Sequence, residues 1–190
     1  MKKQPAPGER ASGDLGRLVA RAESVLERVE LLLPPKVADP DWTKVTAARW
    51  RKRHGQGVLQ GVAHPHVVAL DHLVAIDEQK RRLDDNTRQF VAGRPANNVL
   101  LTGSRGTGKS SLVKAMLSRH AARGLRLIEV DKADLADLPD IVERIESDPH
   151  RFVIFCDDLT FDVGEAGYKA LKVALDGSIA GAADNVVVYA

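Results

Sequence analysis

The sequence predicts an α/β fold in which helices cover both faces of a parallel β-sheet. Two observations indicate this fold class. From Asp71 onward, short apolar runs alternate with segments whose apolar residues recur at helical spacing, the order expected of strand–helix–strand units. The apolar runs are also nearly continuous, as in strands that are buried on both sides. A helical N-terminal segment precedes this region.

The N-terminal segment is expected to contain one amphipathic helix. Residues 1–13 are rich in Pro, Gly, Ser and charge, which predicts a flexible tail. Between Asp14 and Leu33, apolar residues recur every three or four positions, and Pro34 then ends the helical pattern. The apolar face suits packing on the same domain or a neighbour, and also a dedicated partner or oligomerisation helix.

Residues 36–71 are predicted to be irregular, because proline and glycine interrupt them repeatedly. They contain a basic run from Arg49 to His54 with Trp50 inside it. Such a run is able to contact nucleic-acid phosphates and stack a base. The alternative is a solvated cationic turn whose tryptophan packs on the domain. We therefore expect a helical and irregular segment over 14–70, followed by the α/β domain over 71–190.

The α/β domain is predicted as alternating elements. Helices are expected at 78–91, 109–123, 139–146 and 168–175, and strands at 98–102, 125–130, 152–156 and 186–189.

Residues 103–110 match the pattern G-x-x-x-x-G-K-S/T of a phosphate-binding P-loop, directly after a predicted strand and before a predicted helix. The glycines let the backbone aim its N–H groups at an anion, and the helix adds the positive end of its dipole. Lys109 would reach the β- and γ-phosphates, and the Ser110 hydroxyl would ligate magnesium. The predicted phosphate-binding residues are Gly103, Ser104, Arg105, Gly106, Thr107, Gly108, Lys109, Ser110 and Ser111.

Asp157 and Asp158 follow the apolar strand predicted at 152–156, so they emerge at its carboxyl end, where open α/β sheets bind ligands. We expect Asp157 to orient the magnesium shell, and Asp158 to position or deprotonate an attacking water. The alternative is that the two acids cap the next helix. Together with the P-loop, they predict binding of ATP with Mg²⁺.

Composition excludes several other classes of protein. The single cysteine, Cys156, cannot form an intramolecular disulfide and is expected to be a small buried strand residue, so the cytoplasm is the predicted location. No apolar run is long enough to span a membrane. The formal net charge of +2 comes from nearly equal numbers of basic and acidic residues, so any nucleic-acid contact must be local. The histidines show no zinc-ligand spacing.

The sequence around these motifs resembles the AAA+ ATPases. The resemblance rests on 103–111, on the strand ending in Asp157 and Asp158, and on 72–79. The runs 86–90, 95–101 and 155–159 look more closely like a bacterial AAA+-type family of ATP-binding proteins of undefined cellular role. This resemblance covers residues 45–190.

The resemblance implies several roles. Leu73, Val74 and Ile76 would lie against the adenine, while Lys109 with Ser110 would form the Walker A site and the two acids the Walker B site. A nucleotide-dependent homo-oligomer is also implied. The chain departs from the usual pattern at Ala75, where such adenine-side segments usually have glycine, and at Asp158, where most AAA+ proteins have glutamate.

A third departure is that the pattern stops at Ala190, before the sensor residue, arginine finger and helical lid of an AAA+ module. We therefore expect an incomplete AAA+-like domain. The leading functional hypothesis is an ATPase, a hydrolase that remodels a protein or nucleic-acid partner in its full-length form. The alternatives are an ATP-gated binding module or scaffold that does not hydrolyse ATP, and a small-molecule kinase.

Overall fold

The computed structural model describes residues 7–30, 38–53, 55–157, 159 and 183–190. The chain divides into two compact units, Met1–Val37 and Ala38–Ala190, which are described separately. The hairpin described below joins residues 38–70 to the unit that holds the α/β domain, so the boundary between units lies earlier than the predicted one after residue 70.

The first unit contains helix α1 (Pro7–Glu30), which is longer at its start than the apolar pattern indicates. Residues 7–13, for which a flexible tail was predicted, are helical in the structure. Proline is tolerated in the first turn of a helix because its missing N–H would have no partner there. Leu18, Val25 and Leu26 are exposed on this helix. Residues 31–33 of the predicted helix lie outside the described part of the chain.

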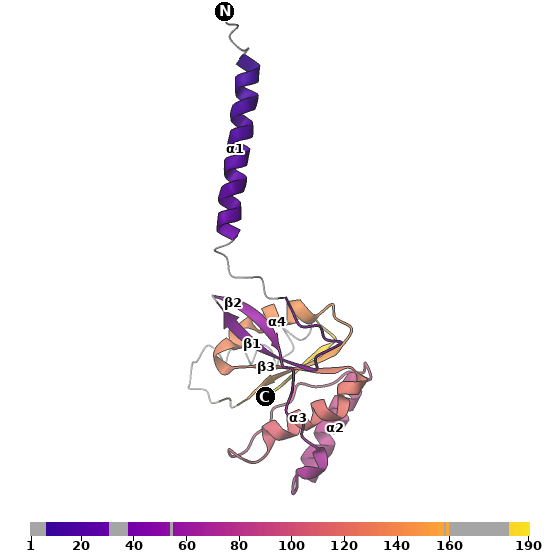
Figure 1. Ribbon diagram of the computed structural model, residues 1–190. Helices are drawn as coiled ribbons and strands as arrows, with labels where there is room; N and C mark the ends of the chain where they lie inside the picture. The colour runs from indigo at the N-terminus through magenta and orange to yellow at the C-terminus, as the bar shows by residue number, and fades with distance from the viewer. Residues whose placement is uncertain (1–6, 31–37, 54, 158, 160–182) are drawn as a thin grey trace, which may run out of the picture. The chain divides into compact units, whose positions relative to one another are not determined.

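The second unit is built on a five-stranded sheet, and this confirms the predicted fold class (Figure 1). The strand order is β2-β1-β3-β4-β5, with β1 antiparallel to β2 and every other pair parallel. The strands are β1 (Ala47–Arg53), β2 (Gln56–Gly61), β3 (Leu125–Val130), β4 (Arg151–Cys156) and β5 (Val186–Tyr189). The last three match their predicted positions.

The β1–β2 hairpin is the main departure from the predicted fold, because residues 36–71 were expected to be irregular. The indole of Trp50 on β1 lies against the backbone of Gly57 on β2, where an added Cβ would come within 1.9 Å of the ring. Only glycine fits there. Gly55, in the connection between the strands, has a φ of +77°, which also favours glycine. The two glycines that suggested loops are therefore requirements of the hairpin.

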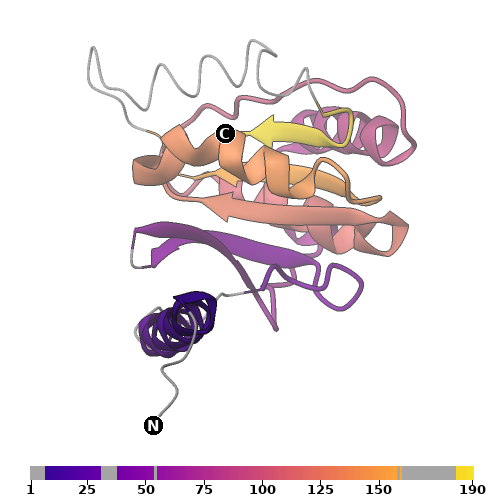
Figure 2. The same ribbon diagram turned by 90° about the horizontal axis from the view of Figure 1, so that it is seen from above.

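Helices cover both faces of the sheet (Figures 1 and 2). On one face, α4 (Leu138–Ile145) buries Leu138, Ile141 and Ile145 in a core cluster with alternate residues of the strands. On the other face, α2 (Asp77–Val91) and α3 (Lys109–His120) form a second cluster with the intervening strand residues. Strands buried from both sides explain why β3, β4 and β5 are continuously apolar.

Short 3₁₀ segments connect these elements. They are η1 (Leu70–His72), η2 (Ala121–Arg123) and η3 (Lys132–Asp137). The helix predicted at 168–175 lies outside the described residues. Among the helices that are described, none combines the length and the apolar character that a membrane span requires.

The segment predicted as a strand at 98–102 runs beside β5. Within the described residues, Val99 forms one isolated parallel bridge to Tyr189. The Val99 N–H donates to the Val188 carbonyl at 2.9 Å, the Ala190 N–H donates to the Val99 carbonyl at 2.9 Å, and the Leu101 N–H donates to the Ala190 carbonyl at 2.6 Å. This segment leads directly into residues 103–110. It lies beyond β5, so that β5 separates it from β4 in the sheet.

Candidate phosphate-binding site

The predicted P-loop adopts a backbone that only glycine accommodates without strain. Gly103, Gly106 and Gly108 have φ angles of +143°, +84° and +86°. Gly108 is also the N-terminal cap of α3, so the loop passes straight into the first turn of that helix. Unpaired N–H groups and the positive dipole end of α3 therefore face the same region as the loop. This arrangement is suited to an anion.

Lys109 holds its ammonium group over the loop. Its Nζ donates to the carbonyl oxygens of Gly103 at 2.7 Å and Ser104 at 2.8 Å. Thr107 closes the same turn by donating its hydroxyl to the Ser104 carbonyl at 2.9 Å. The described partners of the lysine are neutral carbonyl groups rather than carboxylates. Its charge is therefore not neutralised by these contacts.

Ser110 and Asp157 are brought together although they are 47 residues apart in the sequence. Ser110 lies in the first turn of α3, and Asp157 directly follows the carboxyl end of β4. The Ser110 hydroxyl donates to Oδ1 of Asp157 at 2.7 Å. A hydroxyl and a carboxylate are oxygen ligands of the kind that Mg²⁺ takes in phosphate sites. Their contact fits the predicted magnesium roles of both residues, whereas Asp158 lies outside the described residues.

The described part of the chain contains no cluster of three or more His, Cys, Asp or Glu side chains that could hold a metal ion. A structural zinc or calcium cage is thus not seen there. Magnesium at nucleotide sites commonly uses one or two protein ligands and completes its shell with phosphate oxygens and water. The Ser110–Asp157 pair is sufficient for that mode of binding.

The predicted adenine side lies next to the loop. Leu73 and Ile76 are half-buried against the core cluster of α2 and α3, whereas Val74 is 80% exposed. An added Cβ on Gly108 would lie 4.0 Å from the Leu73 Cδ2 atom, so this leucine approaches the end of the P-loop. Leu73 therefore lies beside the end of the P-loop, and Ile76 packs against the same core cluster. The Val74 side chain is exposed to solvent.

Ala75 has a φ of +62°, the left-handed region that favours glycine. The alanine that replaces the usual glycine of AAA+ proteins at this position therefore adopts a backbone conformation that favours glycine. The bend at Ala75 separates Leu73 from the start of α2. An alanine there carries a backbone strain that glycine would not.

The other predicted phosphate-binding residues occupy the loop and the helix start. Ser104 and Arg105 are exposed, and Ser111 is half-buried in the first turn of α3. The structure thus brings 103–111, Asp157 and Leu73 to one end of the sheet.

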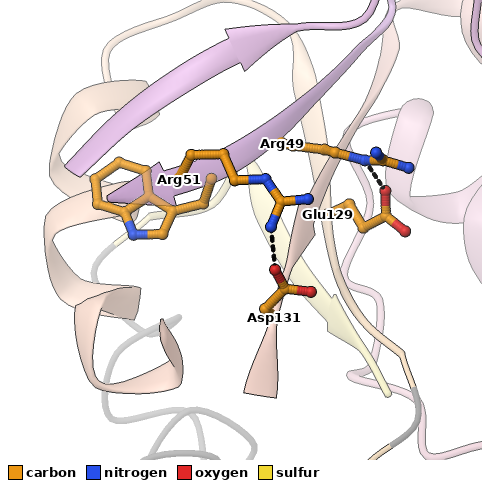
Figure 3. A pocket seen from close by; sticks show the side chains of 5 residues that line it. Arg49, Arg51, Glu129 and Asp131 are labelled. Atoms are coloured by element: carbon orange, nitrogen blue, oxygen red, sulfur yellow. Dashed lines mark hydrogen bonds and ion pairs between the residues drawn. The ribbon is translucent and has the colours of Figure 1, made fainter. Parts of the chain in front are cut away.

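The basic run of the sequence forms strand β1 and not a turn. Its side chains are paired with acids at the carboxyl end of β3, around a polar cavity of about 150 Å³ (Figure 3). The Arg49 Nε donates to Glu129 at 2.6 Å, and Arg51 forms an ion pair with Asp131. These partners neutralise the two arginines.

Trp50 is 1% exposed, so its ring is not available to stack a base, and the alternative in which it packs on the domain is confirmed. Its indole N–H donates to Oδ2 of Asp137 at 2.9 Å. Lys52 lies 3.0 Å from the same carboxylate oxygen, and this hydrogen bond raises the pKa of the lysine. The run therefore serves to attach β1 to the sheet.

Cys156 is buried at the end of β4, and burial raises the pKa of its thiol to about 12. A thiol with so high a pKa is protonated near neutral pH and is a poor nucleophile or metal ligand. The expectation of a small buried strand residue is confirmed.

No motif of the sequence includes the polar side chains that lie behind the loop. Asn86, Thr87 and Asn98 form hydrogen bonds that connect α2, β5 and the segment before residue 103. These three residues lie in the runs 86–90 and 95–101, which carried the family resemblance. Neither run matches a catalytic or ligand-binding motif, so nothing in the sequence singles these residues out.

Comparison with known proteins adds one relationship. Residues 43–190 match the protein family described as "Protein of unknown function (DUF815)". No curated protein matches the chain. No solved structure matches it either. The matched region begins just before β1 and includes the P-loop, β4 and β5.

Proposed function

Because the chain belongs to the DUF815 family, whose description names no activity, we propose a function from the site: binding of ATP with Mg²⁺ at the P-loop, followed by ATP hydrolysis. The observation that carries this proposal is the contact between Ser110 and Asp157 beside a loop with three positive-φ glycines. A glycine-rich turn without function would need no carboxylate at the end of β4.

The proposed roles follow from the chemistry of each side chain. Backbone N–H groups of the loop and the N-terminus of α3 would bind the β- and γ-phosphates, and Lys109 would exchange its carbonyl contacts for phosphate oxygens. Ser110 and Asp157 would hold the magnesium ion, which draws negative charge from the phosphates when bound. Leu73 and Ile76 would pack against the base.

Hydrolysis requires one further group. In the proposed step, a water oxygen attacks the γ-phosphorus while the bond between this phosphorus and the bridging oxygen breaks, and ADP leaves with the electron pair. The water's proton passes to a base, the role proposed for Asp158. The free energy of hydrolysis would drive remodelling of a protein or nucleic-acid partner. The resemblance to AAA+ ATPases implies that a homo-oligomer carries this out.

Ligand-induced stabilisation tests the binding step. A ligand that binds only the folded chain at a concentration of 100 Kd stabilises it by about 2.7 kcal/mol. We expect Mg-ATP to raise the melting temperature of the wild-type chain, and Lys109→Ala to remove this rise. Lys114→Ala, on the same helix, is the matched control and should keep it. An unchanged melting temperature of the wild type at saturating Mg-ATP would refute nucleotide binding.

Phosphate release tests the hydrolysis step separately. Asp158→Ala is expected to retain Mg-ATP binding and to lose phosphate release. A wild-type chain that binds Mg-ATP but releases no phosphate would instead be the ATP-gated binding module. Phosphate transfer to an added small molecule, with no release to water, would favour a kinase.

A further inference from the structure

The segment before the P-loop lies at the edge of the sheet, beside β5. Among the described residues, three backbone hydrogen bonds join Val99 and Leu101 to Val188 and Ala190, and they hold the segment on that one side. A loop that must place N–H groups accurately around a phosphate needs a firmly positioned strand before it. Side chains of α2 add support to the residues just before this pairing begins.

Asn86 on α2 holds the backbone of this segment in both directions. Its Oδ1 accepts from the Asn97 N–H at 2.9 Å, and its Nδ2 donates to the Asn97 carbonyl at 2.9 Å. Because the backbone N–H can only donate, the orientation of the Asn86 amide follows from the pair of bonds. The second hydrogen of Nδ2 points to the Tyr189 hydroxyl, 3.1 Å away. All of the amide's donors are thereby used.

Tyr189 joins the same network from β5. Its side chain is fully buried, and its hydroxyl oxygen lies 2.8 Å from Thr87 Oγ1. Thr87 already donates its one hydroxyl hydrogen to the Leu83 carbonyl at 2.8 Å. The tyrosine hydroxyl therefore donates to Thr87 and accepts from Asn86. Each polar hydrogen of the network has a single acceptor, which specifies one arrangement.

Helix α2 also carries the other side of the candidate site. Residues 73–76 lead directly into its first turn, and Leu73 and Ile76 pack in the cluster that holds Leu83 and Phe90 of the helix. Helix α2 thus supports residues 73–76 at its own N-terminus. Through Asn86, the same helix holds the segment before the P-loop. The spacing between the base side and the phosphate side depends on both attachments.

We propose that Asn86 is a positioning residue that sets the distance between the segment 73–76 and the P-loop, so that base and triphosphate bind together. This inference rests on the proposed nucleotide binding. It assigns a physical role to Asn86 and Asn97, which belong to the runs 86–90 and 95–101 that carried the family resemblance. Asn86 itself need not touch the nucleotide.

The inference is tested by comparing two ligands that differ only in the nucleoside. Titration calorimetry would give the Kd of Mg-ATP and of magnesium tripolyphosphate for the full chain. Asn86→Ala is expected to reduce the preference for ATP over tripolyphosphate by about tenfold, equivalent to loss of one well-placed contact. A general loss of fold stability would weaken both ligands equally and leave the preference unchanged.

Asn185→Ala is the matched control, because Asn185 is another asparagine whose amide donates to backbone carbonyls, and it is buried whereas Asn86 is half-buried. Its Nδ2 donates to the carbonyls of Ile145 at 2.8 Å and Asp148 at 3.0 Å, before the start of β5. This variant is expected to lower the melting temperature and keep the ligand preference. If Asn86→Ala does not fold, Asn86→Asp keeps the shape of the side chain and the bond from the Asn97 N–H, and should reduce the preference in the same direction.

The outcomes separate the two proposals. Wild-type binding of Mg-ATP with an unchanged preference in a folded Asn86 variant overturns the positioning role alone. A wild-type chain that binds neither ligand overturns the proposed function and this inference with it. A wild-type chain that binds both ligands equally tightly, without any preference for ATP, shows that 73–76 do not read the base and overturns the inference.

Discussion

The β1–β2 hairpin and the P-loop both place cations at the same edge of one mostly parallel sheet, but the partners of these cations differ. Arg49 and Arg51 each have a carboxylate partner from the end of β3. Lys109 has two carbonyl oxygens of its own loop as described partners. A carboxylate neutralises a cation, whereas a carbonyl dipole holds it in place and leaves its charge available to an anion. A basic run is therefore not itself evidence of a phosphate site.

The largest effect on stability is expected from Trp50→Ala. This substitution tests whether β1 has a structural role, in contrast to the P-loop. Trp50→Ala removes a ring that is 1% exposed, and should lower the free energy of unfolding by about 3–5 kcal/mol. Urea denaturation monitored by far-UV circular dichroism measures this loss. Lys109→Ala, in the nucleotide-free chain, is the comparison and should cost less than about 1 kcal/mol. Equal losses in the two variants would contradict the division of roles.

An intermediate effect is expected from removing the carboxylates at the end of β3 that pair with the hairpin arginines. The double variant Glu129→Gln and Asp131→Asn leaves Arg49 and Arg51 without their carboxylates while preserving side-chain size. We expect it to gain affinity for single-stranded DNA, with log K falling against log salt at a slope of about −1.4 for two phosphate contacts. Fluorescence anisotropy across salt concentrations measures the slope.

The wild-type chain is the control for this experiment. Its affinity for single-stranded DNA is expected to be independent of salt concentration, because its arginines are already paired with carboxylates. A steep slope in the wild type would mean that the arginines already bind phosphates in spite of their ion pairs. Removing such exposed pairs should change the stability of the fold by only about 0–1 kcal/mol each.

The smallest effect is expected at Ala75, beside the P-loop. Its φ of +62° costs an alanine about 1–2 kcal/mol, and glycine recovers this at an entropic cost of about 0.5–1 kcal/mol. Ala75→Gly should therefore stabilise the chain by up to about 1.5 kcal/mol, measured by chemical denaturation. Ala92→Gly is the matched control, because Ala92 has an ordinary φ of −83°, and should destabilise. Stabilisation by both substitutions would remove strain as the explanation.

Local patterns were sufficient for the elements whose signals are contained within a few residues. The apolar runs predicted β3, β4 and β5, and the glycine spacing with Lys109 predicted the P-loop and the start of α3. The hairpin was missed because β1 exposes arginines on one face, and the acids that neutralise them are about 80 positions away in the sequence. Gly57 reads as a loop residue unless Trp50 is known to lie across it.

The sequence by itself determined the P-loop pattern and the start of α3, because the glycine spacing and the lysine that define them lie within residues 103–110. Only the tertiary structure decided that the Ser110 hydroxyl and the Asp157 carboxylate are in contact, that Arg49 and Arg51 are neutralised, and that Asn86 holds the segment before the loop. Each of these depends on hydrogen bonds or ion pairs between distant parts of the chain. Such contacts act over a few ångströms, so residue order does not specify them until the sheet brings the partners together.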